Sequence, residues 1–132
     1  LGLFRSNEVV EEIILPESLK IIEDQAFLGA TALRKLEING IEPMGDYCIY
    51  GCPKIKEVRL PEGLKELGES AIENCENLTD IYLPSTLETI DEYNFDLCAD
   101  GLKIHVPAGS NTETLVREVV KNLEYNVEVV PE

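Results

Sequence analysis

An apolar pattern repeats along the chain with a period of about 23 residues. The last strand-like residue of each copy is Leu15, Ile38, Leu60, Leu83 and Val106, and only the step from Ile38 to Leu60 is shorter than the others, by one position. One unit of this length cannot bury its own apolar face, whereas stacked units bury their faces against one another. The sequence therefore predicts a solenoid in which the backbone makes one turn per repeat.

The residues that lead up to each of these positions alternate in the manner of a β-strand. In the first copy, Ile13 and Leu15 face one side while Ile14 faces the other. Proline follows in four copies and ends the strand, because it has no N–H group to donate to a neighbour. These residues are Pro16, Pro61, Pro84 and Pro107. Since each strand lies one turn from the next, we expect a parallel sheet of about five short strands.

Further columns keep the same register and predict the rest of the core. One column contains Leu19, Ile41, Leu64 and Leu87. A second contains Ile22, Met44, Leu67 and Ile90. A third contains Phe27, Ile49, Ile72 and Phe95. Each of these positions is apolar in every copy, so we expect all of them to face the interior of the coil.

The four cysteines also follow the repeat. Cys52, Cys75 and Cys98 occupy one column, and Cys48 falls in the small-residue column of Ala26. Free cysteine is among the most buried residue types, so this placement favours buried thiols. Disulfides and half of a zinc site at Cys48 and Cys52 are the alternatives. A structural zinc site needs about four converging ligands, and the sequence predicts no metal site.

Two segments resemble the BspA-like class of leucine-rich repeats. They are Leu78-Thr-Asp-Ile81-Tyr-Leu83-Pro84 with Asn94-Phe95-Asp-Leu-Cys98, and Leu60-Pro61 through Ala71-Ile72-Glu-Asn-Cys75. The resemblance covers about residues 10–107 and implies an α/β fold, a curved right-handed leucine-rich-repeat solenoid. It also implies a place outside or on the surface of a bacterial cell. The departures are Asn39-Gly40 in place of proline and Asn94 in place of alanine, which affect local turn geometry.

The two ends of the chain differ from the repeats. Residues 1–9 are expected to form a partial repeat, in which Leu3-Phe4 matches Ala26-Phe27, and residues 10–107 the solenoid of about four repeats plus a final strand. The chain thus begins within a repeat, which is expected either for a segment of a longer repeat protein or for a partial cap. Residues 108–132 are expected to form a C-terminal cap.

The cap should contain a helix and a short strand. Ser110 and Glu113 fit a capping box at the start of the helix. Its apolar face would consist of Leu115, Val116, Val119, Val120 and Leu123, and the strand of Val127, Val129 and Val130. A helix placed there would cover the last coil and hide its open edge. The alternative is an amphipathic helix that binds a partner.

Charge and composition exclude several functions. The chain has 26 acidic and 11 basic residues, a net charge of −15, which disfavours nucleic acid and anionic membranes as partners. Its apolar runs fall far short of the roughly 20 residues that span a bilayer, so no membrane insertion is expected. His105 is the single histidine and is expected to be solvated on its strand. No nucleophile with a base and an orienting group can be named, and no cofactor motif is present, so we predict no enzyme.

The outward positions of the strands are the candidate binding surface. They read Ile14, Glu37, Arg59, Tyr82 and His105 down the stack. The flanking column reads Glu12, Lys35, Glu57, Asp80 and Lys103. Solenoids use such faces for partners, and exposed tyrosine and arginine are enriched at binding hot spots. The alternative is that these side chains only pair across strands, for example Glu37 with Arg59.

The preferred hypothesis is a non-enzymatic repeat module that presents this face to a protein or a glycan, in adhesion or another interaction. We expect it to be monomeric, secreted or held at the cell surface, and part of a longer chain. A structural spacer or stalk is the second hypothesis, and an accessory domain of an enzyme is the third.

Overall fold

The predicted parallel sheet is confirmed. The computed structural model describes residues 2–40 and 43–132. Within these residues six strands lie side by side in one parallel sheet, here called sheet A. Its order is β1 (Glu12–Leu15), β2 (Lys35–Ile38), β4 (Glu57–Arg59), β6 (Asp80–Tyr82), β8 (Leu102–Val106) and β9 (Val127–Pro131). The sheet exceeds the expected five strands because the C-terminal strand β9 pairs with β8.

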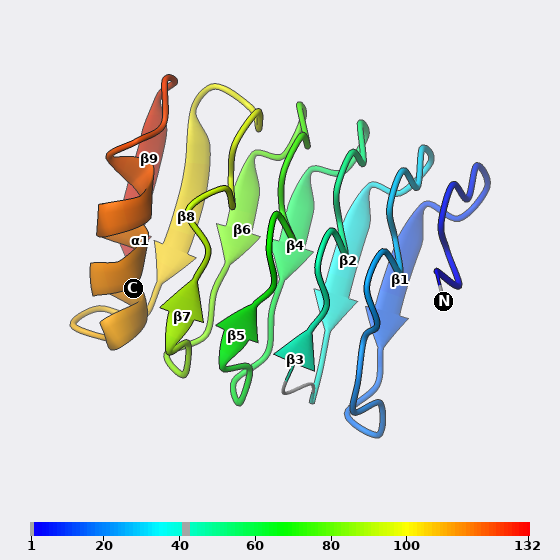
Figure 1. Cartoon of the computed structure of the whole chain (residues 1–132), viewed down its shortest axis with the longest axis horizontal. Helices are drawn as coiled ribbons and strands as arrows, with labels where there is room; N and C mark the ends of the chain where they lie inside the picture. Colours follow the sequence, from blue (N-terminus) through cyan, green and yellow to red (C-terminus); the bar gives the residue numbers. More distant parts are fainter. Residues whose placement is uncertain (1, 41–42) are drawn as a thin grey trace.

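A second sheet runs along the other side of the coils (Figure 1). Sheet B consists of β3 (Pro43–Met44), β5 (Glu66–Leu67) and β7 (Thr89–Ile90), all parallel. The sequence placed Met44, Leu67 and Ile90 in one apolar column but did not predict strands there. Strands of two residues are too short for an alternating pattern to reveal them.

The core lies between the two sheets, and the apolar columns meet in register. Ile13 pairs with Leu36, and the column continues through Val58, Ile81 and Ile104. All five of these side chains are buried. Burial of one aliphatic side chain contributes about 1.5–3 kcal/mol relative to its exposure. Ile41 of the predicted Leu19 column lies outside the described residues, and Leu64 and Leu87 of that column are buried.

All four cysteines are buried free thiols. The Sγ atoms of Cys52 and Cys75 each donate a hydrogen bond of 3.1 Å to a carbonyl of the preceding coil, at Phe27 and Ile49. The column therefore joins adjacent coils through hydrogen bonds from thiol to backbone. In the described part of the chain, no group of three His, Cys, Asp or Glu residues could hold a metal ion.

The two departures from the repeat pattern change the turns in which they occur. Gly40 has a φ of 79°, and a Cβ there would lie 2.5 Å from the carbonyl oxygen of Glu17, so only glycine fits. Asn94 is fully buried. Its side-chain oxygen accepts a hydrogen bond of 2.9 Å from the N–H of Ile72, and its amide nitrogen donates one of 3.0 Å to the carbonyl of Gly68.

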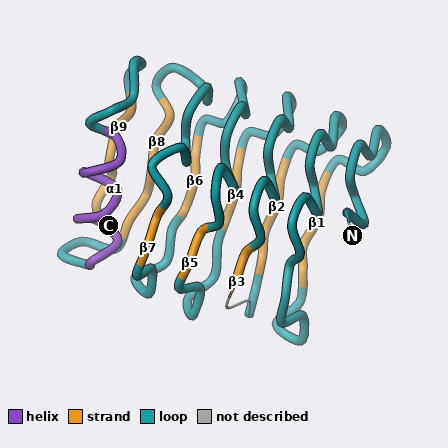
Figure 2. The backbone as a smooth tube through the Cα atoms, viewed as in Figure 1, coloured by secondary structure: helices purple, strands orange, loops and turns teal. Residues whose placement is uncertain are grey.

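The two ends of the solenoid differ. At the N-terminal end, the rings of Phe4 and Phe27 stack with centroids 5.5 Å apart. At the other end lies the helix α1 (Asn111–Val120), shown at one end of the stack in Figure 2. Ser110 caps it as predicted by accepting the N–H of Glu113. The carboxylate of Glu113, however, accepts the N–H of Gly109 rather than that of Ser110.

Candidate functional site on the outer face of sheet A

The predicted outward column lies in register across the sheet. Ile14 is paired with Glu37, Glu37 with Arg59, Arg59 with Tyr82, and Tyr82 with His105. The flanking column is also in register, in the order Glu12, Lys35, Glu57, Asp80 and Lys103. The spacing of the repeat was enough to predict that these residues lie side by side on neighbouring strands.

Three members of the outward column form one continuous stack. The guanidinium carbon of Arg59 lies 3.8 Å from the centre of the Tyr82 ring. On its other side, Tyr82 stacks on His105 with ring centroids 4.1 Å apart and planes at 8°. Adjacent strands are about 4.8 Å apart, which suits planar groups stacked face to face. A cation over an aromatic ring contributes about 0.5–1 kcal/mol at an exposed site.

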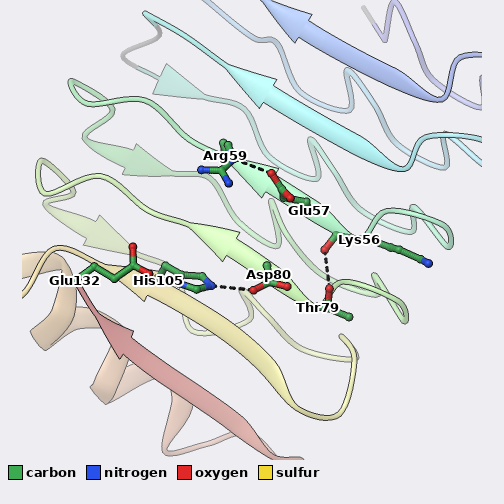
Figure 3. Close-up of polar contacts among 7 residues, drawn as sticks. All are labelled: Lys56, Glu57, Arg59, Thr79, Asp80, His105 and Glu132. Carbon is green, nitrogen blue, oxygen red and sulfur yellow. Dashed lines mark hydrogen bonds and ion pairs between the residues drawn. The ribbon is translucent and has the colours of Figure 1, made fainter.

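Carboxylates lie beside Arg59 and His105, the two outer members of this stack (Figure 3). The Nε of Arg59 lies 2.6 Å from a carboxylate oxygen of Glu57 on the same strand. This hydrogen bond raises the pKa of Arg59 above its usual value. The alternative interpretation paired Arg59 with Glu37, whereas the guanidinium contacts Glu57, although the backbones of Glu37 and Arg59 are in register.

The expectation of a solvated His105 is wrong. Only 11% of its side chain is exposed, because the Tyr82 ring covers one face of the imidazole and the carboxylates of Asp80 and Glu132 contact its two nitrogens. Its Nε2 lies 2.8 Å from Asp80 and its Nδ1 lies 2.8 Å from Glu132. Since an ionised carboxylate only accepts hydrogen bonds, each contact is a hydrogen bond when the facing ring nitrogen carries a proton.

The electrostatics of Asp80 follow from this arrangement. The hydrogen bond with His105 lowers the pKa of Asp80, and smaller contributions come from Thr79, from the charge of His105 and from Lys103. Thr79 also donates its hydroxyl to the carbonyl of Lys56, which ties the start of β6 to the neighbouring coil (Figure 3). Asp80 is thus held as a carboxylate beside the His105 ring.

The candidate residues at the N-terminal half of the face do not join the stack. Ile14 is 59% exposed, and Lys35 contributes a long ion pair of 3.9 Å with Glu12. The site is therefore concentrated on β4, β6 and β8. A shallow pocket of about 130 Å³ lies beside it, bordered by Tyr82, His105, Pro107 and Glu132.

Glu132 is a member of the site that sequence reasoning missed. It follows β9, whose pairing with β8 brings it to His105. The strand-like valines at 127, 129 and 130 were recognisable, but nothing in the sequence indicated their register.

The outer face of sheet A gathers groups of several chemical kinds. It offers a guanidinium, two stacked rings and three carboxylates. Such groups bind ligands through stacking and charged hydrogen bonds. In residues 2–40 and 43–132, no helix has the length and apolar character to cross a membrane.

Comparison with known proteins agrees with the repeat geometry. The family model described as "BspA type Leucine rich repeat region" matches residues 2–123 in six copies. Repeats of this type are associated with bacterial surface proteins, and leucine-rich-repeat solenoids are typically non-enzymatic. Neither a curated protein nor a solved structure matches the chain significantly.

Proposed function

Because the chain belongs to the BspA-type leucine-rich repeat family, we propose that it is a non-enzymatic binding module of a bacterial surface protein. The outer face of sheet A is its recognition surface, and the partner is a protein or a glycan. The observation that carries this proposal is the Arg59–Tyr82–His105 stack, since the strands bring together there the residue types that dominate binding hot spots.

The mechanism is complementarity without covalent chemistry. The stack is held by its own carboxylates before a partner arrives, so little side-chain freedom is lost on binding. The exposed part of Arg59 and the edge of Tyr82 would contact the partner directly. Glu57, Asp80 and Glu132 would accept hydrogen bonds from hydroxyl or amide groups and would repel acidic partners.

Affinity measurements on paired variants test the recognition surface. Purified glycans and extracellular proteins are first screened against the native chain, and the tightest ligand is then titrated against Arg59→Ala/Tyr82→Ala. We expect binding to weaken by about 2 kcal/mol or more, as for a hot spot. The matched control is Glu66→Ala/Thr89→Ala, which removes exposed strand residues from sheet B and should leave the affinity unchanged.

Equal affinity of both double variants for the ligand would contradict the proposal. A screen in which the native chain binds nothing would favour the spacer hypothesis instead, in which the stacked coils set the distance between other parts of a surface protein. Thermal unfolding of both variants shows whether a loss of binding reflects a loss of fold.

A further inference from the structure

A second surface, distinct from the outer face of sheet A, lies on the turns that follow the strands of sheet B. It is a groove of about 460 Å³ bordered by Tyr47, Tyr50, Ser70, Tyr93 and the carboxylates of Glu69 and Glu73. Between Tyr47 and Tyr50 in the chain lie Cys48 and Ile49, both fully buried, so the turn directs its outer side chains away from the core. The repeat columns do not require aromatic residues here.

In this groove, a small residue on one coil lies between tyrosines on the two neighbouring coils, which leaves a gap between the tyrosines. Tyr47, Ser70 and Tyr93 occupy equivalent positions in three consecutive repeats. Consecutive coils are about 4.8 Å apart, so the two tyrosine positions are separated by about 10 Å. Ser70 between them has a small side chain that is only 5% exposed, whereas Tyr93 is 50% exposed. A planar cation placed over Ser70 would lie between the two tyrosine positions, about one coil spacing from each, and so could contact both rings.

The negative charge of the groove favours a cationic group as its ligand. Among the described residues, neither Glu69 nor Glu73 forms an ion pair with a lysine or arginine, and no basic residue lines the groove. The Tyr47 hydroxyl donates a hydrogen bond of 3.1 Å to Glu69. That bond and the charges of Glu69, Glu73 and Asp46 raise the pKa of Tyr47, as expected in a negative potential.

We propose that this groove binds an arginine side chain of a basic peptide segment, with the guanidinium between Tyr47 and Tyr93 and paired with Glu69 and Glu73. Arginine suits the site because its planar group stacks on aromatic rings and forms charged hydrogen bonds at its edge. The net charge of −15 would also speed the approach of a basic partner. This inference does not depend on the outer face of sheet A, and either surface can fail alone.

The test uses a capped glycine-rich peptide with two arginines and the same peptide with citrulline, which has nearly the same shape but no charge. Binding is followed by NMR through the amide of Ser70 and the tyrosine rings. We expect the arginine peptide to shift these resonances and the citrulline peptide to bind about tenfold more weakly. Equal binding of the two peptides would overturn the proposal.

Two variants distinguish binding in the groove from nonspecific attraction to the acidic surface of the chain. Tyr93→Leu keeps every charge and should weaken binding of the arginine peptide about threefold or more. Glu76→Gln removes an exposed carboxylate that does not border the groove and should leave binding within about twofold of the native value. The same loss in both variants, or no loss in Tyr93→Leu, would show only nonspecific attraction and would contradict the proposal.

A third variant fills the gap directly. Ser70→Tyr suits the backbone, because Tyr47 occupies the equivalent position with a φ of 52° and Ser70 has a φ of 48°. We expect it to abolish binding of the arginine peptide. A neutral oligosaccharide that shifts the Ser70 and tyrosine signals when the arginine peptide does not would assign the groove to sugars and overturn the proposal.

Discussion

At the scale of single residues, the side chain of Asn94 replaces a backbone group. In the three preceding coils, Phe4, Phe27 and Ile49 each donate their N–H to a carbonyl of the small-residue column in the next coil. In the coil that follows these three, Ile72 donates instead to the Asn94 side chain. The backbone is thereby redirected, and Phe95 takes a φ of 75°. The sequence identified Asn94 as a departure, but the hydrogen bonds that explain it depend on coil-to-coil distance.

The first prediction concerns the removal of this side chain. Asn94→Ala leaves the buried N–H of Ile72 without its partner and removes one of the two hydrogen bonds that the Gly68 carbonyl accepts, the other coming from the N–H of Ala71. We expect the free energy of unfolding to fall by about 1–3 kcal/mol, measured by urea denaturation. No change would mean that the turn returns to the path of the alanine-containing repeats, and it would contradict a structural role for the amide.

The second prediction concerns pH and Asp80. The pKa of Asp80 is lower in the folded chain than in the unfolded chain, first of all through its hydrogen bond with His105. Its stabilising contribution is therefore complete above the unfolded pKa of about 3.9 and is lost as the pH falls through the folded value. Asp80→Asn should be less stable than the native chain at about pH 5.5, and the difference should shrink as the pH falls below about 4. A difference that is constant with pH would contradict this assignment.

At the scale of elements, the sequence predicted where the strands of sheet A lie, but it did not predict the side-chain contacts between neighbouring strands. The regular spacing of the apolar pattern predicted sheet A, and proline marked where β1 and β8 end. Sheet B was missed because its strands have two residues each. The outward column was predicted, yet its stacking was not, since it depends on side-chain rotamers and on the register of β9.

The third prediction belongs to the helix α1 and its attachment. Thr112 is buried and donates its hydroxyl to the carbonyl of Pro84 at 2.6 Å. Thr112→Val keeps the shape but leaves that carbonyl unpaired, so we expect a loss of about 1–2 kcal/mol in thermal or urea unfolding. Thr114→Val, an exposed change on the same helix, is the control and should differ little from the native chain. Equal stability of the two variants would argue against anchoring of the helix by Thr112.

At the scale of the whole molecule, one continuous core joins every coil from Ile13 to Val119. Each column was visible in the sequence because its apolar residues recur at a fixed interval. The partner was not visible, because recognition depends on exposed residues that the repeat leaves free to vary. The acidic surface excludes partners of like charge rather than identifying one.

The fourth prediction uses the cysteine columns as reporters of this core. Burial raises the pKa of Cys48 to about 12 and that of Cys52 to about 11, whereas a hydrogen bond with Cys75 lowers the pKa of Cys98. A thiol reagent should therefore find four groups in denaturant and, in the native chain, should react first with Cys98. Fewer than four reactive groups after unfolding would indicate a disulfide, and rapid native reaction of Cys48 would contradict the packing of its column.

The most direct test of the recognition surface is the NMR signal of His105, since the chain has no other histidine. The ring stacks on Tyr82 and borders the surface proposed to meet the partner. Addition of the tightest ligand from the screen should shift the His105 ring protons, and Arg59→Ala/Tyr82→Ala should abolish that shift. A ligand that binds fully while the His105 signals stay fixed would contradict recognition by the outer face of sheet A.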